Sequence, residues 1–220
     1  MPRQIQPRLV ISTVGTSLLT NQINSKKKSE SDWSFCLQDN ANLTEQKINP
    51  GSEIDNIIQD LKLRAEDKLN KANTIEIRET SAELNGIYGL YDDQLEKGRL
   101  DHHVLITTDT AQGKITAKIV EEFLRERRIS VEVYTPAKLS TANTQDFNHG
   151  IDNLLDWIHR RVKEDKKEKN YEIYFNLVGG FKALQGCMNT FGMFYADKII
   201  VSPQYFGETV IQASMTNQKD

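Results

Sequence analysis

Short apolar segments rich in β-branched residues recur along the chain, separated by longer amphipathic ones. The first segment, residues 8–14, ends at Gly15, and the fourth, residues 171–177, is followed by Gly179 and Gly180. Short apolar runs bounded by glycine or proline are typical of buried strands. We therefore expect strands over residues 8–14, 104–108, 129–134, 171–177, 199–201 and 208–211.

Helices are expected between these strands. Apolar side chains recur with a period near 3.6 after Ser52, a good N-cap residue, and again after Gly113 and over residues 145–163. A weaker helical pattern covers residues 80–98, and residues 181–195 form the last expected helix. Residues 25–50 are polar and predict a loop or a partly ordered insertion.

Strands that alternate with amphipathic helices specify a mostly parallel sheet covered by helices on both faces. The fold class is therefore α/β, a Rossmann-like doubly wound sheet with a helical insertion after the first strand. We expect residues 1–220 to form a single domain, with residues 25–100 as a polar loop and helical arm inserted in it. Ligands of such sheets bind beyond the carboxyl ends of the strands.

Composition narrows the function. The 220 residues include 28 Lys and Arg against 31 Asp and Glu, and the net charge of −3 argues against binding of long nucleic acid through many phosphate contacts. Cys36 and Cys187 are far apart and form no disulfide framework or metal-ligand spacing. Because the chain has no signal-peptide pattern and no run of about 20 apolar residues, we expect a cytoplasmic protein without membrane contact.

Three of the expected strands end in turns of small or hydroxyl-bearing residues. Such turns let backbone N–H groups approach an anion, and a helix N-terminus adds the positive end of its dipole. Lys182, in the first turn of the last expected helix, would add a full positive charge. We expect a phosphate-binding site with the candidate residues Gly15, Thr16, Ser17, Thr108, Asp109, Thr110, Gly113, Asn176, Gly179, Gly180, Phe181 and Lys182.

Each candidate also has a purely structural interpretation. The glycines can serve as ordinary strand-to-helix turns, and Thr16 and Ser17 can serve as N-caps. Lys182 fits this interpretation less well, because a cation in the first turn of a helix opposes the dipole unless an anion is bound there.

Two other motifs are weaker. Residues 109–114 resemble the end of a Walker loop but lack its first glycine and the hydroxyl residue after the lysine, which disfavours an NTPase. His102 and His103 are adjacent, so near a strand they point to opposite faces and are poorly placed to share a metal. We expect no metal site and no cofactor.

Four sequence blocks together resemble the CRISPR-associated Rossmann fold (CARF) family. They are residues 10–21 (VISTVGTSLLTN), 81–85 (SAELN), 107–110 with Gly113, and 176–184 (NLVGGFKAL), and they occur in the family's order across nearly the whole chain. The resemblance implies a homodimer that binds a cyclic oligoadenylate, the second messenger of type III CRISPR immunity, in a pocket shared by its two sheets. Cyclic tetraadenylate is the expected ring because its symmetry matches a two-fold dimer, although a six-membered ring would match too.

Many relatives carry a further HEPN ribonuclease domain, marked by an Arg followed four to six residues later by a His. Here Arg99 is followed by His102 after only three residues, and the chain ends soon after the last expected strand. We therefore expect a stand-alone ring nuclease, which cleaves the messenger without metal and ends the response. By resemblance, Lys182 stabilises the transition state while Ser17 orients the attacked phosphate. The remaining candidates hold neighbouring phosphates, ribose or adenine.

Two alternatives stay open. The chain could be a non-catalytic cyclic oligoadenylate sensor that regulates an effector or partner. It could also be a nucleotide-binding enzyme of the general doubly wound class, which the absence of G-x-G-x-x-G disfavours. The pattern of residues 25–100 does not decide whether this arm covers the pocket or extends a dimer interface.

Overall fold

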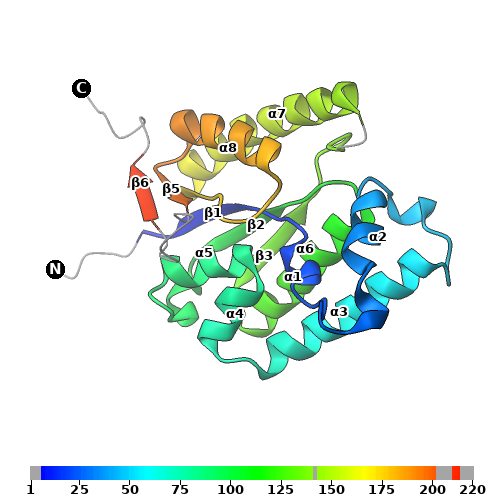
Figure 1. Ribbon diagram of the computed structural model, residues 1–220. Coiled ribbons are helices and arrows are strands. Elements are labelled where there is room, and N and C mark those ends of the chain that lie inside the picture. Colours follow the sequence, from blue (N-terminus) through cyan, green and yellow to red (C-terminus); the bar gives the residue numbers. More distant parts are fainter. Residues whose placement is uncertain (1–5, 141–142, 202–209, 214–220) are drawn as a thin grey trace.

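A six-stranded sheet forms the centre of the computed structural model, which describes residues 6–140, 143–201 and 210–213 (Figure 1). The strand order is β3-β2-β1-β4-β5-β6; β1 to β5 are parallel, and β6 is antiparallel to β5. The strands are β1 (Arg8–Thr13), β2 (His102–Ile106), β3 (Ser130–Tyr134), β4 (Glu172–Asn176), β5 (Lys198–Val201) and β6 (Val210–Ala213).

Helices cover both faces of this sheet, as Figure 1 shows: α7 and α8 lie on one side, and the other helices lie on the opposite side. The chain passes from β1 outward to β2 and β3, then returns through α7 to β4 on the other side of β1. The helices are α1 (Ser17–Thr20), α2 (Trp33–Asp39), α3 (Glu53–Lys71), α4 (Thr74–Thr80), α5 (Ala82–Leu90), α6 (Ala111–Glu126), α7 (Thr144–Glu168) and α8 (Lys182–Tyr195), with 3-10 turns at η1 (Lys28–Glu30), η2 (Glu45–Lys47) and η3 (Leu95–Gly98).

The switch in winding direction falls between β1 and β4. In an open α/β sheet, the connections that leave the two strands at this point run to opposite sides of the sheet. They leave a crevice beyond the strand ends, and this crevice is the usual ligand site. The Rossmann-like fold class expected from the sequence is therefore confirmed, and the fold itself marks the turns after β1 and β4 as the place to examine.

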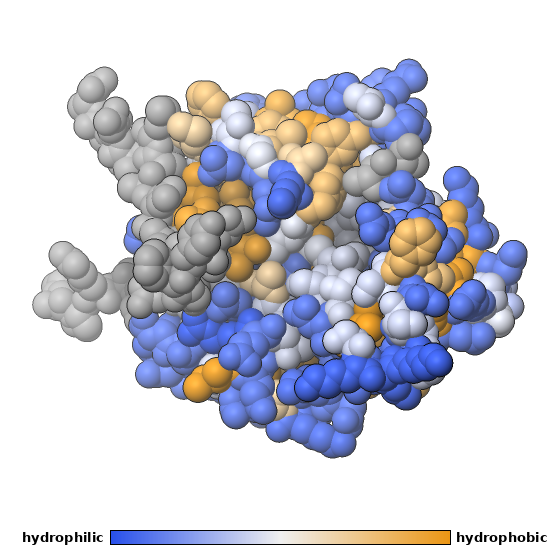
Figure 2. Space-filling model, in the orientation of Figure 1, coloured by the Kyte–Doolittle hydropathy of each residue, from blue (hydrophilic) through white to orange (hydrophobic). Residues whose placement is uncertain are grey.

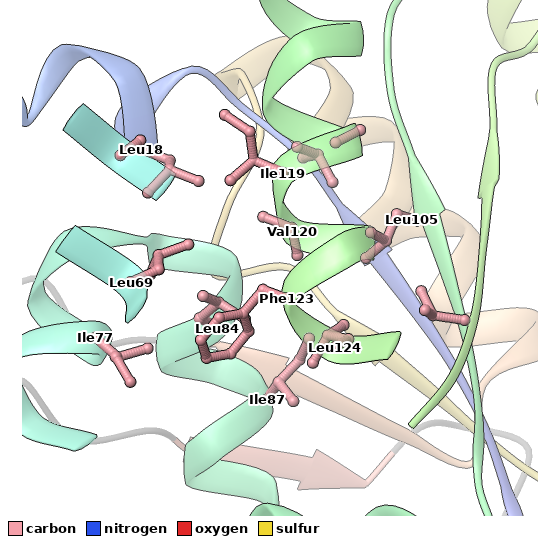
Figure 3. Close-up of a cluster of buried hydrophobic side chains, with 14 of the residues drawn as sticks. Leu18, Leu69, Ile77, Leu84, Ile87, Leu105, Ile119, Val120, Phe123 and Leu124 are labelled. Atoms are coloured by element: carbon pink, nitrogen blue, oxygen red, sulfur yellow. The ribbon is translucent and has the colours of Figure 1, made fainter. Parts of the chain in front are cut away.

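Successive residues of a strand point to opposite faces of the sheet, and each face packs into its own hydrophobic core. In β1, Val10 belongs to the core under α1 to α6, whereas Leu9 and Ile11 belong to the core under α7 and α8. All three side chains are fully buried, as expected for a parallel sheet covered on both faces. Figure 3 shows the larger core, in which the helices contribute Leu18, Leu69, Ile77, Leu84, Ile87, Ile119, Val120, Phe123 and Leu124 against Leu105 of the sheet.

The expected strands and most expected helices are present, with shifts of a few residues. Ser52 caps α3 as predicted, because its side chain accepts a hydrogen bond from the Asp55 N–H. The weak helix expected over residues 80–98 is present but shorter, as α5 followed by the 3-10 turn η3, whereas α4 was not expected. Ser81 lies between α4 and α5 and caps α5 through the Leu84 N–H. Residues 208–209 of the last expected strand lie outside the described residues.

The polar segment at residues 25–50 is more ordered than its composition predicts, because it forms η1, α2 and η2. The buried carboxylate of Glu30 anchors it through two hydrogen bonds to the Arg64 guanidinium of α3, at 2.8 and 3.0 Å. Hydrogen bonds from Arg64 and from the Asn24 N–H lower the pKa of Glu30 to about 2. Leu37 of α2 is buried in the larger core. One buried ion pair and one buried leucine thus hold a segment that is polar elsewhere.

Among the helices of the described residues, none combines the length and the apolar character that crossing a membrane would require.

A polar network is buried at the amino ends of the strands. The Tyr91 hydroxyl donates to Asp101 Oδ2 at 2.8 Å and lies 2.8 Å from His103 Nε2, while the Arg8 side chain bonds the same carboxylate. Since a hydroxyl has only one proton to donate, His103 Nε2–H must be the donor to Tyr91. His103 Nδ1 is then an unprotonated nitrogen, buried without a hydrogen-bond partner.

This network makes stability depend on pH. Burial, followed by the charges of His102 and Arg8, lowers the pKa of His103 from 6.5 to about 3. Below pH 6.5 the unfolded chain therefore binds a proton that the folded chain does not. The free energy of unfolding should fall as the pH drops from about 6.5 to about 3, by up to ~1.4 kcal/mol per pH unit from this group.

Urea unfolding measured across this pH range tests the expectation. His103→Phe should give a shallower pH dependence than the wild type, whereas replacing the exposed His149 (His149→Asn) should leave it unchanged. Equal pH dependence in the wild type and in His103→Phe would contradict the assignment.

Candidate functional site

A cavity of about 400 Å³ lies at the switch point, beyond the carboxyl ends of β1, β2 and β4. In Figure 2, pale surface of intermediate hydropathy occupies the centre of this face, over α1 and between α8 and α2. The cavity is lined by Val14, Gly15, Thr16, Ser17, Thr20, Ala41, Ala82, Thr108, Thr110, Gly113, Val178, Gly179, Gly180 and Phe181.

The turns after β1 and β4 touch each other in the floor of the cavity. A Cβ atom on Gly15 would lie 3.1 Å from the Gly180 backbone nitrogen, and one on Gly180 would lie 2.8 Å from Cβ of Thr13. Gly180 also has a φ of +95°, which L side chains rarely adopt. The Thr13 hydroxyl donates to the Gly179 carbonyl and ties the two turns together. Two backbones can come this close only because both turns are built from glycine.

Glu83, at the start of α5, supports these two turns from below. Its carboxylate is fully buried and accepts hydrogen bonds from the Gly15 N–H at 2.6 Å and from the Ser81 hydroxyl at 2.8 Å. A Cβ on Gly179 would lie only 2.3 Å from Glu83 Oε1. The carboxylate therefore positions the turn after β1 and leaves no room for a side chain at Gly179. It also uses the Gly15 N–H, which the sequence analysis expected to bind a phosphate.

Free donors surround the cavity on the side of α1 and α8. Neither helix has a side-chain N-cap, and α2 also lacks one, whereas α3 to α7 are all capped by Ser, Thr or Asn side chains. The first N–H groups of a helix need a partner. At the start of α8 the exposed Lys182 forms no ion pair within the described residues. An anion in the cavity would satisfy the uncapped helix ends and the lysine together.

The opposite side of the cavity is built differently. Thr108 and Thr110 join their hydroxyls at 2.8 Å, and the Thr110 hydroxyl accepts from the Gly113 N–H at 3.2 Å, which caps α6. A Cβ on Gly113 would lie 2.5 Å from Oγ1 of Thr108. Ala41, from the turn after α2, completes this wall. This side offers hydroxyls and a methyl group.

Most of the predicted residues come together here, but three do not line the cavity. Lys182 follows the lining residue Phe181 in sequence, and its exposed side chain is not part of the lining. Asp109 is partly buried, with Oδ1 unpartnered, and its backbone N–H donates to Leu139. Asn176 is fully buried, and its amide donates to the Ser12 hydroxyl and the Glu83 carbonyl at 3.2 and 3.0 Å. The side-chain hydrogen bonds of Asn176 therefore link β4 to β1 and to α5. These bonds are internal to the fold and do not face the cavity.

Sequence reasoning missed Glu83, Ala82 and Ala41. Glu83 lies in the SAELN block, where an acidic residue beside apolar neighbours resembles an ordinary first-turn helix residue. Its burial could have been suspected from the apolar segment that follows, but its partner, the Gly15 N–H, is 68 residues away. Ala41 carries no chemical signal in the sequence. Within the described residues, no group of three or more His, Cys, Asp or Glu is placed to hold a metal.

Comparison with known proteins gives one family. The model of a family described as CRISPR-associated protein (Cas_APE2256) matches residues 78–212, more than half of the chain. The matched range includes Glu83, the Thr108–Gly113 turn and the Gly179–Lys182 turn, and it begins after the Gly15–Ser17 turn. A search of curated proteins finds no significant match.

The glycine contacts yield a stability prediction. Gly179→Ala should destabilise the fold by about 1–3 kcal/mol, because the new methyl group would overlap the Glu83 carboxylate and overpacking costs this much. The matched control is Gly186→Ala in α8, where nothing lies within 4 Å of the added Cβ. That control should stabilise the protein by up to about 1 kcal/mol, since alanine favours the helix.

Both free energies of unfolding can be measured by urea denaturation. If Gly179→Ala were as stable as the wild type, the close packing of Glu83 under the turn would be wrong.

Proposed function

This chain belongs to the CRISPR-associated protein (Cas_APE2256) family, and on that premise we propose that it is a ring nuclease that binds and cleaves a cyclic oligoadenylate. Family membership indicates a role in CRISPR defence. The ligand and the reaction are inferred from the chemistry of the cavity together with the CARF resemblance of residues 10–21, 81–85, 107–113 and 176–184. Cyclic tetraadenylate is the ring we expect.

The observation that carries the proposal is the cluster of unsatisfied positive groups at one cavity. The uncapped N-termini of α1 and α8 lie at the switch point of the sheet, and Lys182, which follows the lining residue Phe181, forms no ion pair within the described residues. Each group alone is a common feature of α/β proteins, but together they favour an anionic ligand with more than one phosphate. The hydroxyl-rich side at Thr108 and Thr110 suits the ribose and base of a nucleotide.

The size of the cavity supports a shared site. About 400 Å³ is near the lower end of the range for pockets that bind one small ligand, which is roughly 300–1,000 Å³. A ring of four nucleotides is several times larger than one nucleotide. Two chains related by a two-fold axis would each present the same patch to half of the ring, which is an isologous arrangement.

The reaction needs little from the protein beyond geometry and charge. The 2′-oxygen of one ribose forms a bond to the adjacent phosphorus, and the bond from phosphorus to the 5′-oxygen breaks. The 2′-hydroxyl proton leaves with the 5′-oxygen in the balanced reaction, so no water is consumed. The ammonium group of Lys182 would stabilise the charge that develops on the phosphate oxygens, and Ser17 would hold the phosphate in line.

One observation favours the sensor alternative. Lys182 is exposed and does not line the cavity in the single chain. A sensor would need the positive cluster for binding alone. Measurements that separate binding from turnover distinguish the two functions.

The purified protein should cleave synthetic cyclic tetraadenylate in the presence of EDTA and leave linear products with 2′,3′-cyclic phosphate ends. Lys182→Ala should lower the single-turnover rate by about 100-fold or more, in the range reported for loss of one transition-state donor, and Ser17→Ala should lower it less. Binding affinity should change much less than the rate in both variants.

Lys118→Ala, which removes an exposed lysine of α6 with the same change in charge, is the control and should retain full activity. Product ends are identified by chromatography and mass spectrometry. Tight binding without cleavage in the wild type would support the sensor, and loss of cleavage on chelation would contradict the mechanism.

Light scattering should give about twice the monomer mass of 25.2 kDa in the absence of ligand. A shared site requires the two copies to meet before or when the ring binds. A protein that stays monomeric with saturating cyclic tetraadenylate would rule out the shared cavity.

A further inference from the structure

The segment that carries Ala41 is docked firmly against the start of α6. On one side of Ala41, the Leu37 carbonyl accepts a hydrogen bond from Gln112 Nε2 at 2.8 Å. On the other side, the Leu43 carbonyl accepts from the Ala111 N–H at 2.8 Å. The turn itself is closed by the Ala41 N–H, which donates to the Gln38 carbonyl at 3.2 Å. Ala41 is therefore held in place from both sides.

This docking changes the chemistry of the α6 side of the cavity. The N–H groups of Ala111 and Gly113, two of the first three in α6, are already bonded to Leu43 and Thr110. Asp109, between Thr108 and Thr110 in sequence, does not line the cavity and supplies no further donor there. A helix end whose first donors are occupied is a poor place for a phosphate.

The two sides of the cavity therefore differ in their free N–H donors, and this difference favours one orientation of a bound nucleotide. Its phosphates face the uncapped ends of α1 and α8, and its base faces the wall formed by Ala41, Thr108 and Thr110. We propose that Ala41 is a specificity-determining residue, whose methyl group limits the space for the base. This inference rests on the proposed function, since it assigns one side of the same cavity to the base of a cyclic oligoadenylate.

Ala41→Leu tests the inference, because it adds three carbon atoms to the wall without altering a charge. It should weaken binding of cyclic tetraadenylate by at least tenfold, measured by isothermal titration calorimetry. Gln46→Leu places the same side chain at an exposed position of the same segment and should bind like the wild type. Thermal unfolding of both variants shows whether the segment remains folded.

The salt dependence of Kd shows whether the phosphates or the base of the ligand contact the wall at Ala41. Phosphate contacts set the slope of log Kd against log salt concentration. Ala41→Leu should keep the wild-type slope, and Lys182→Ala should reduce it. If Ala41→Leu binds as tightly as the wild type, or changes the salt slope, the inference is wrong. If the wild type itself does not bind cyclic tetraadenylate, the proposed function fails instead.

Discussion

The close contact between the turns after β1 and β4 is the constraint on which the site depends. Parallel neighbouring strands end at the same edge of the sheet, so their turns compete for the same space. Here Gly15 and Gly180 pack backbone to backbone, and Glu83 fills the space beneath them. Because no side chain separates the two turns, α1 and α8 both start at one point. The cavity lies beside these two helix ends and extends to the turn after β2.

The buried carboxyl group of Glu83 faces the turns and not the cavity, and both of its oxygens are already hydrogen-bonded within the fold. It accepts from the Gly15 N–H and the Ser81 hydroxyl, and hydrogen bonds to a carboxylate are stronger than those between neutral groups. The helix ends above it remain uncapped, in contrast to α3 to α7. The hydrogen bonds of Glu83 are thus made within the fold, while the N–H groups at the starts of α1 and α8 remain available to a ligand. This arrangement separates the group that positions the turn from the groups left to meet a ligand.

The sequence predicts the sheet and the turns at its edge because both follow from local patterns. Apolar runs ending in Gly15 or Gly179 mark strands and their carboxyl ends without any knowledge of distant contacts. The ordered α2 segment was not predictable in this way, since its anchors are Glu30 with Arg64 and Leu43 with Ala111, pairs separated by 34 and 68 residues. Asn176 shows the converse error, because a polar residue at a strand end can be used entirely for packing.

The two ends of the sheet carry different kinds of polar group. At the amino ends, Tyr91, Asp101 and His103 are buried and, together with Arg8, form a network of hydrogen bonds. At the carboxyl ends, polar groups surround an open cavity, and the uncapped ends of α1 and α8 have donors without a partner among the residues that the structure describes. Unsatisfied groups cost stability when buried, but here water or a ligand can reach them. The donors left open at this end of the sheet are therefore available to water or to an anionic ligand.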